Sequence, residues 1–167
     1  PFARTPINFA ADIAYTYQNN YADAIKILQI GLKANPKELS FMNNLAYAYA
    51  LNGQTKEADE ILIKLLPLVS NERELYICAK ATNGLNEYRK GNIEVGRKLY
   101  SESVNYAIQV DAINLVHKAL LNNIREEIRA THQCSTELLQ LLDKLHTGNE
   151  RETEAMKNEI NKMLSSL

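Results

Sequence analysis

The chain has 167 residues, 46% of them hydrophobic, and its 19 Lys and Arg residues against 20 Asp and Glu give a formal charge of −1. A chain of this length and composition can bury a core as one domain, and a nearly neutral chain has no overall field that would attract nucleic acid or an anionic membrane. We therefore expect one folded domain with no nucleic-acid partner and no membrane partner.

Helix-forming residues dominate the chain, and proline occurs only at positions 1, 6, 36 and 67. Apolar residues recur at helical spacing, as Phe9, Ile13 and Tyr17 do. In chain order, the predicted helices span residues 6–18, 22–34, 38–51, 55–66, 72–90, 93–109, 111–130, 136–145 and 150–164.

The predicted turns contain residues that end helices. Asn19 and Asn20 interrupt the first helical pattern, and Pro36 cannot continue the second. Gly53 follows an asparagine between two segments of helical period, so we interpret it as a left-handed residue after a helix rather than as part of a strand turn. Gly91 marks the next turn in the same way.

Two helix ends can be predicted in more detail. Asn71 with Glu74 offers an N-cap and a third-position carboxylate at the start of the helix near residue 72. The last helix should turn one apolar face inward and a polar face outward, as the cap of a helical array requires. The residues of that inward face are Met156, Ile160, Met163 and Leu164.

The chain also repeats itself at a nearly fixed period. Ala24 and Ala58 lie 34 residues apart, and Gly96 follows Ala58 after 38 residues. A period near 34 with small residues at recurrent places is typical of stacked helical hairpins. The repeats are predicted at about residues 5–38, 39–72 and 77–110, followed by a helical extension, residues 111–167, within a single domain of residues 1–167.

The second repeat has Ala46 in its first helix, Gly53 at its turn and Ala58 in its second helix. With these residues it resembles the tetratricopeptide repeat (TPR) family. The resemblance implies an all-α, right-handed α-solenoid of antiparallel helical hairpins with C-terminal capping helices. The chain departs from the family pattern at Asp12, where a small residue is expected, and at Ile108, where a proline would end the third repeat.

Small residues have a physical role in this pattern. Two helices pack roughly 8–10 Å apart only where the contacting residues allow close approach. We therefore expect Ala24, Ala58 and Gly96 to be buried between neighbouring helices.

In this family the first helix of each repeat lines a concave groove. The resemblance therefore implies a non-catalytic protein-protein interaction module that binds a peptide segment or a helix of a partner protein. Tyr and Arg often dominate the binding energy at such surfaces, although a Tyr at helical spacing can equally be ordinary packing. The implied partner-binding residues are Phe9, Ile13, Tyr17, Asn43, Asn44, Tyr47, Thr82, Leu85, Tyr88 and Arg89.

Two other functions remain open at this stage. One is a ligand- or peptide-sensing regulatory domain that controls a fused or partner effector, which a closed pocket near Tyr47 and Tyr88 would favour. The other is a self-associating structural scaffold, whose groove the C-terminal helices or a second copy would fill. We expect a monomer or a weak homo-oligomer.

The family members that grip the acidic tails of chaperones use Lys, Asn and Arg in the groove. This chain has Phe9, Ile13, Asn44, Cys78 and Thr82 at those places, of which only Asn44 fits. Charge-assisted hydrogen bonds contribute about 1.5–3 kcal/mol each. Without the cations that make them, we predict no binding of such tails.

The sequence predicts no metal site, no cofactor and no enzymatic activity. His132 and Cys134 are too close to act as two ligands on one helix face, and no second pair with zinc-type spacing follows. Cys134 lies near a helix start and could have a lowered pKa, but nothing marks an activating base. His117 is expected at the boundary of the apolar stripe of its helix.

Glu126 and Glu127 diverge by about 100° around a helix and cannot form a carboxylate pair by themselves. With Arg125 and Arg129 they are predicted to form a solvated face. An enzyme would instead need one of these carboxylates to converge with His117 and His132 across helices.

Two further features bear on location. The longest apolar stretch is interrupted by Lys64 and Pro67 and is far shorter than the roughly 20 residues of a membrane helix. Cys78 and Cys134 lack C-x-x-C spacing, so we expect free thiols in a reducing cytoplasm. The chain begins at Pro1 without a signal-peptide pattern, which favours a segment of a longer cytoplasmic protein.

Overall fold

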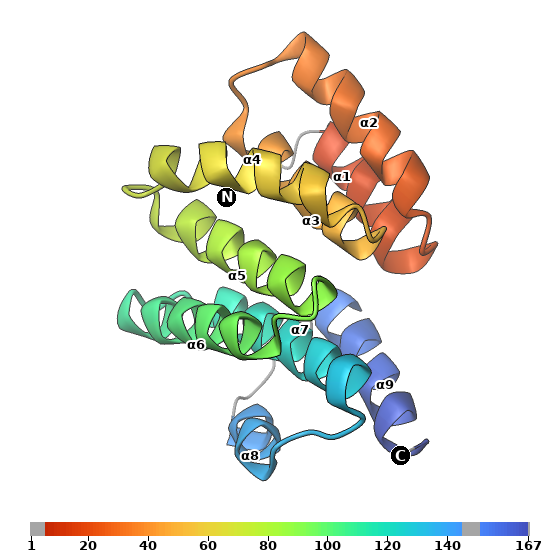
Figure 1. The fold of residues 1–167 in the computed structure, drawn as a ribbon, viewed down its shortest axis with the longest axis vertical. Coiled ribbons are helices and arrows are strands. Elements are labelled where there is room, and N and C mark those ends of the chain that lie inside the picture. The colour runs from red at the N-terminus through yellow and green to blue at the C-terminus, as the bar shows by residue number, and fades with distance from the viewer. Residues whose placement is uncertain (1–5, 145–150, 167) are drawn as a thin grey trace.

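The computed structural model describes residues 6–144 and 151–166. Within these residues the chain is helical and has no strand, which confirms the all-α prediction. Figure 1 shows the chain progressing along the long axis of the molecule, from α1 and α2 at one end to α8 and α9 at the other. The elements are α1 (Pro6–Asp12), the π-helix η1 (Ile13–Tyr17), α2 (Tyr21–Ala34), α3 (Leu39–Leu51), α4 (Thr55–Leu68), α5 (Arg73–Arg89), α6 (Ile93–Gln109), α7 (Ile113–Thr131), α8 (Thr136–Lys144) and α9 (Arg151–Leu164).

These bounds agree with the predicted helices to within a few residues, and three differences have physical reasons. The first predicted helix is split, because residues 13–17 widen into a π-helix in which the Gln18 amide donates to the Ile13 carbonyl at 3.3 Å. Helix α4 continues through Pro67 to Leu68, since a proline in the final turn removes only one helical hydrogen bond.

The third difference is at the start of α5. The expected Asn71 cap is wrong, because Glu72 is the N-cap residue and makes no side-chain capping bond. A tight turn places it there, in which the Glu72 amide donates to the Val69 carbonyl at 2.8 Å.

The predicted turn residues do adopt left-handed backbone conformations. Gly53 has φ of 78° and Gly91 has φ of 85°, a region that glycine enters without steric cost. Asn19 takes the same role between η1 and α2 with φ of 52°. Each of these residues joins two successive helices into a hairpin.

The odd-numbered helices lie next to one another in chain order. Helix α3 packs against α1 and α5, and α5 packs in turn against α7. The even-numbered helices join them, since α2 and α4 pack against α3, and α4 and α6 pack against α5. Four helices far apart in sequence therefore present neighbouring surfaces.

The small residues lie between helices, as predicted. Ala24 and Ala58 are fully buried, and Gly96 is buried as well. A Cβ atom added to Gly96 would lie 2.6 Å from Cδ2 of Tyr88, which is closer than real contacts allow. The approach of α5 to α6 thus depends on the absence of a side chain at Gly96.

The C-terminal helices extend the core. Met156 and Ile160 of α9 are buried against α7, and Met163 and Leu164 pack against the same cluster, so the predicted inward face is confirmed. Within the described residues, no helix has the length and the hydropathy needed to cross a bilayer.

Candidate functional site

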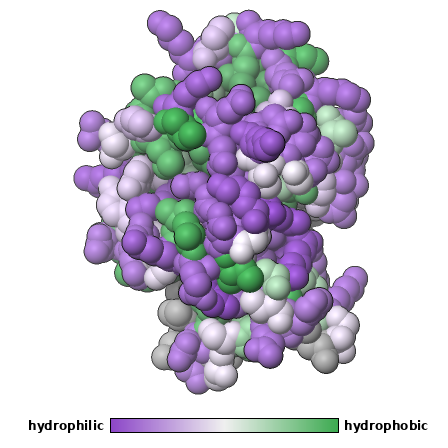
Figure 2. All heavy atoms as spheres, in the orientation of Figure 1, coloured by the Kyte–Doolittle hydropathy of each residue, from purple (hydrophilic) through white to green (hydrophobic). Residues whose placement is uncertain are grey.

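The surface itself shows no dominant apolar patch on the face in Figure 2, where small hydrophobic areas are separated by hydrophilic residues. Ile30 and Ile63 are the most exposed large apolar side chains among the described residues, at 64% and 73%, and they lie on α2 and α4. Single exposed apolar residues are normal on protein surfaces. The cavities between helices are therefore the better candidates for a binding site.

A cavity of about 290 Å³ lies between the odd-numbered helices and is called the groove cavity here. Its walls come from α1, η1, α3, α5 and α7, with one side chain from α6. The lining residues are Asn8, Asp12, Tyr15, Asn43, Asn44, Tyr47, Ile77, Cys78, Ala81, Thr82, Tyr100, Leu115, Lys118, Ala119 and Asn122.

One wall of the groove cavity is rich in side-chain amides. The Asn44 amide nitrogen donates to Oδ1 of Asn8 at 2.9 Å, and the Asn8 amide donates to the Ser40 hydroxyl at 3.0 Å. Behind them, the Thr82 hydroxyl donates to Oδ1 of Asn43 at 3.1 Å. These bonds join α1, α3 and α5 and hold the amides in fixed orientations.

Another part of the lining, called the apolar wall here, comes from α5 and α7. Ile77 and Ala119 are almost fully buried, and Ala81 and Leu115 are half-buried around them. The groove cavity thus combines a hydrogen-bonding wall with an apolar one, the usual composition of ligand sites in proteins.

Tyr47 closes one end of the groove cavity by reaching across to α7. Its hydroxyl donates to Oδ1 of Asn122 at 3.2 Å, and its ring packs edge-on against Tyr15 at a centroid distance of 5.3 Å. Beyond this point begins a second, smaller space.

This second space has a volume of about 60 Å³ and is called the arginine cavity here. It lies between η1, the following turn, the start of α2, α3, α7 and α9, and it shares Tyr15 and Tyr47 with the groove cavity. The lining residues are Tyr15, Thr16, Asn19, Tyr21, Tyr47, Leu51, Arg125, Arg129, Met156 and Glu159.

The predicted solvated face of α7 is wrong. Arg125, Glu126 and Glu127 are exposed by only 7%, 2% and 5%, so these charges are buried. Sequence neighbours alone suggested a surface strip, but α5, α6 and α9 pack against α7, and most of the partners of these charges come from other helices. Of the four residues, Arg129 alone stays exposed.

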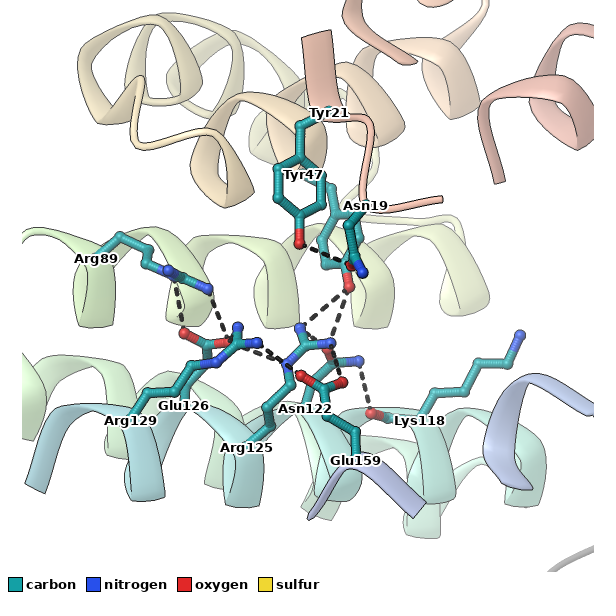
Figure 3. A network of polar contacts seen from close by, with 10 residues as sticks. All are labelled: Asn19, Tyr21, Tyr47, Arg89, Lys118, Asn122, Arg125, Glu126, Arg129 and Glu159. Atoms are coloured by element: carbon teal, nitrogen blue, oxygen red, sulfur yellow. Dashed lines mark hydrogen bonds and ion pairs between the residues drawn. The ribbon is translucent and has the colours of Figure 1, made fainter. Parts of the chain in front are cut away.

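Glu126 is the centre of a set of ion pairs that joins helices. The Arg89 guanidinium of α5 holds both of its oxygens, at 2.8 and 3.2 Å. Arg125 Nε and Arg129 Nη1 approach Oε1 of the same carboxylate at 3.1 and 3.2 Å. Figure 3 shows this network, with Tyr47 on one side of the Arg125 guanidinium and Glu159 of α9 on the other.

Arg125 is held as a cation by its surroundings. Burial opposes its charge, but the Tyr47 hydroxyl and the Glu126 carboxylate outweigh burial and raise the pKa of Arg125 above its ordinary value. The guanidinium therefore supplies a permanent positive charge at the end of the groove.

Glu127 points to the other side, toward α5 and α6. It accepts hydrogen bonds from Arg97 Nε at 2.9 Å and from the Tyr88 hydroxyl at 2.6 Å. The Arg97 hydrogen bonds lower the pKa of Glu127, and burial followed by the Glu127 contact raises the pKa of Tyr88. As expected, the two adjacent carboxylates do not form a pair.

The structure brings together only part of the predicted groove set. Asn43, Asn44, Tyr47 and Thr82 line the groove cavity. Arg89 lies outside it, in the ion pair with Glu126.

The remaining predicted residues lie elsewhere. Leu85 is fully buried and Tyr88 is 5% exposed, so neither side chain is accessible to a partner, and we leave both out of the candidate site. Phe9 and Tyr17 are each 55% exposed and Ile13 is half-buried, and none of the three lines either cavity.

Sequence reasoning missed the residues that α1 and η1 contribute, which are Asn8, Asp12 and Tyr15. The apolar spacing of Phe9, Ile13 and Tyr17 drew attention to the neighbouring face of this segment. The polar i, i+4 pair of Asn8 and Asp12 was the available signal. Asn122 was missed because the repeat pattern fades before α7.

Other predicted chemistry can be placed as well. Among the described residues, no three His, Cys, Asp or Glu side chains come close enough to hold a metal ion. Burial, with the nearby Glu127, raises the pKa of the Cys134 thiol, opposite to the lowered pKa that a helix start suggested. His117 is 3% exposed, so it belongs to the interior and not to a boundary.

No family model, curated protein or solved structure matches the chain. The TPR resemblance therefore stays a prediction, and the function has to be argued from the cavities.

Proposed function

We propose that this protein is a non-catalytic interaction module that binds an extended peptide segment of a partner protein in the groove cavity. The observation that carries the proposal is the lining of the groove cavity, which combines an amide wall formed by Asn8, Asn43 and Asn44 with an apolar wall around Ile77. A side-chain amide both donates and accepts, as a peptide group does, so this wall matches the unpaired backbone of an extended chain. The apolar wall would take one of its side chains.

Size favours a peptide segment over a helix. A helix with its side chains is about 10–12 Å across, whereas the groove cavity has a volume of about 290 Å³, just below the usual range of ligand pockets of about 300–1,000 Å³. A volume of this size suits one or two residues of an extended chain, with the remainder of the segment lying along the odd-numbered helices.

The lining of the groove cavity does not require the bound segment to carry a particular net charge. Asp12 and Lys118 contribute one charge of each sign to the lining of the groove cavity. A neutral segment therefore meets no net repulsion, and affinity would come from hydrogen bonds and apolar contact.

We also propose the architecture that the TPR resemblance implies, a right-handed solenoid. The hairpin turns at Asn19, Gly53 and Gly91 and the succession of α1, α3 and α5 support it. In this arrangement α7 would be the first helix of a further unit, since it packs on α5 as α5 packs on α3. A solenoid presents a preformed surface, which costs little conformational entropy on binding.

The two alternative functions receive less support. A closed pocket near Tyr47 and Tyr88 would favour a sensing domain. Tyr88, however, lines neither the groove cavity nor the arginine cavity. The open volume of about 290 Å³ counts against a scaffold whose groove is filled by its own C-terminal helices, whereas a scaffold filled by a second copy stays an alternative. Cytoplasmic location stays a prediction, and it agrees with Cys78 and Cys134 not being joined by a disulfide.

The test is a selection of short random peptides on the purified chain, followed by calorimetry with the selected peptides. Asn44→Leu should weaken binding roughly tenfold, the equivalent of about 1.4 kcal/mol, because it removes one hydrogen-bonding side chain of the groove cavity. Lys64→Ala, a change at an exposed residue of α4, is the control and should leave affinity unchanged. Peptides that bind both variants equally well would contradict the proposal.

A further inference from the structure

We propose that the arginine cavity is a binding site for a carboxylate group, with the guanidinium of Arg125 as its main donor. The carboxylate can belong to a peptide that lies in the groove cavity or to a free small acid, because the recognising chemistry is the same. The site lies on α7 and α9, away from the positions where TPR proteins clamp chaperone tails.

Arg125 carries hydrogen-bond donors that its neighbours do not use. Its Nε atom donates to Glu126 Oε1 at 3.1 Å, and Nη2 donates to Asn122 Oδ1 at 2.7 Å and to the Tyr47 hydroxyl at 3.4 Å, which leaves Nη1. Among the described residues, the nearest charged acceptor to Nη1 is Oε2 of Glu159, at 3.9 Å, which is longer than a hydrogen bond. A guanidinium that is 7% exposed is thus left with donor capacity beside a cavity that it lines.

The charge of the lining has the sign that an anion requires. Two arginines, Arg125 and Arg129, line the arginine cavity against one carboxylate, Glu159. Counting the Arg89–Glu126 ion pair behind them leaves the same excess of one positive charge. The buried charges of Arg125 and Glu126 balance, and Arg129, which is exposed, pairs with Glu159 at 2.6 Å. The excess charge is thus partly screened by water, and a bound carboxylate would neutralise it.

The size and the remaining donors also fit a carboxylate. One water-sized position needs roughly 10–15 Å³, so a volume of about 60 Å³ accommodates the three heavy atoms of a carboxylate. The Thr16 hydroxyl and the Asn19 amide lie in the same lining. The Tyr21 hydroxyl donates to Oδ1 of Asn19 at 3.3 Å, which leaves the amide nitrogen of Asn19 as a donor.

The position of the site lets it cooperate with the groove cavity. Tyr15 and Tyr47 line both spaces, so an acidic group on a peptide in the groove cavity could extend past Tyr47 toward Arg125. The carboxylate site itself does not require the proposed peptide function, because a free acid would occupy it in the same way. The two proposals can therefore fail separately.

Acetate is the probe for the first experiment. Titration of acetate into the isotope-labelled protein should shift the Nε–Hε resonance of Arg125 in a saturable way. Phosphate, which is bulkier, should bind more weakly. Absence of a saturable Arg125 shift, or tighter binding of phosphate than of acetate, would overturn the assignment.

A pair of charge-matched variants separates a site from general electrostatics. Glu159→Gln removes the carboxylate that lines the cavity and should tighten acetate binding roughly three- to tenfold, as expected when one like charge a few ångströms away is removed. Glu94→Gln removes the same charge from an exposed side chain that pairs with Arg97 outside the cavity, and it should leave acetate binding unchanged. Equal effects of the two substitutions would refute the site. A gain of affinity cannot arise from misfolding, so the result does not depend on a variant that might unfold.

Peptides selected for binding to the groove cavity can show whether the bound carboxylate is a C-terminus or an acidic side chain. Each peptide is measured with a free C-terminus, with an amidated C-terminus, and with its acidic side chains replaced by amides. Loss of affinity together with loss of the Arg125 shift in one arm identifies that carboxylate and supports the site. Acetate binding without any peptide binding would support the carboxylate site and count against the proposed function, whereas peptide binding without an acetate response would do the opposite.

Discussion

At the scale of single residues, buried charges on α7 determine how the C-terminal half is held together. Glu127 receives hydrogen bonds from Arg97 of α6 and Tyr88 of α5, so one side chain connects three helices. The carboxylate and its partners are 30 and 39 positions apart in the sequence. Burial of this kind cannot be predicted from the local sequence. An Arg-Glu-Glu run looks the same whether its helix face is exposed to solvent or is covered by other helices.

Replacement of Glu127 by glutamine should therefore destabilise the protein. We expect the free energy of unfolding to fall by about 1–3 kcal/mol, because Arg97 and Tyr88 lose a charged acceptor while Arg97 keeps access to water. Urea denaturation measures the change. Glu94→Gln, which removes an exposed partner of the same arginine, should change stability by less than about 0.5 kcal/mol.

The same carboxylate predicts a pH dependence. The pKa of Glu127 in the folded protein lies below its ordinary value of 4.5, chiefly because of the Arg97 hydrogen bonds. Its contribution to stability is fully present above the unfolded pKa and is lost as the pH falls through the folded pKa. The difference in unfolding free energy between the wild type and Glu127→Gln should thus shrink below pH 4.5. A difference that stays constant or grows on acidification would show that Glu127 does not act through its charge.

Gly96 tests the close approach of α5 and α6. Alanine at this position would gain up to about 1 kcal/mol of helix propensity, but its Cβ would meet the Tyr88 ring at 2.6 Å, and overpacking costs about 1–3 kcal/mol. We expect a net loss of stability in thermal denaturation. Ser101→Ala, on the exposed side of the same helix, is the control, and a Gly96→Ala protein as stable as the control would contradict the packing account.

At the scale of helices, the sequence predicted most of the structure. The 3.6-residue periodicity, the proline positions and the turn residues Asn19, Gly53 and Gly91 place nearly every helix within a few residues. The π-helix η1 could not be predicted, because its extra residue per turn has no distinct periodicity in so short a segment. Tyr15 lines the cavities because it follows Asn8 and Asp12 at i, i+4, i+7 spacing on one helix face, whereas Tyr17 is on another side and is 55% exposed.

Helix α9 should contribute to the stability of the whole molecule, since its apolar face covers α7. Ile160 is 1% exposed in the core cluster that includes Ile124 and Ile128. Ile160→Ala should lower the free energy of unfolding by about 2–5 kcal/mol, whereas Asn158→Ala on the exposed face should have little effect. Calorimetric melting of both variants measures this, and equal melting temperatures would mean that α9 is not docked in solution.

At the scale of the whole molecule, the candidate site arises from the succession of α1, α3, α5 and α7. The repeat pattern predicted that first helices of successive hairpins would share a surface, and the groove cavity lies between those helices. The sequence placed four of its lining residues, Asn43, Asn44, Tyr47 and Thr82. The contribution of α7 was not predictable from the repeats, because its sequence no longer carries their signature.

The most direct measurement of the central claim is chemical-shift mapping of a selected peptide on the labelled protein. If the groove cavity binds an extended segment, the perturbed backbone amides will cluster at residues 8–15, 43–47, 77–82 and 115–122, which line that cavity. Perturbations confined to the outer helices α2, α4 and α6 would contradict the account.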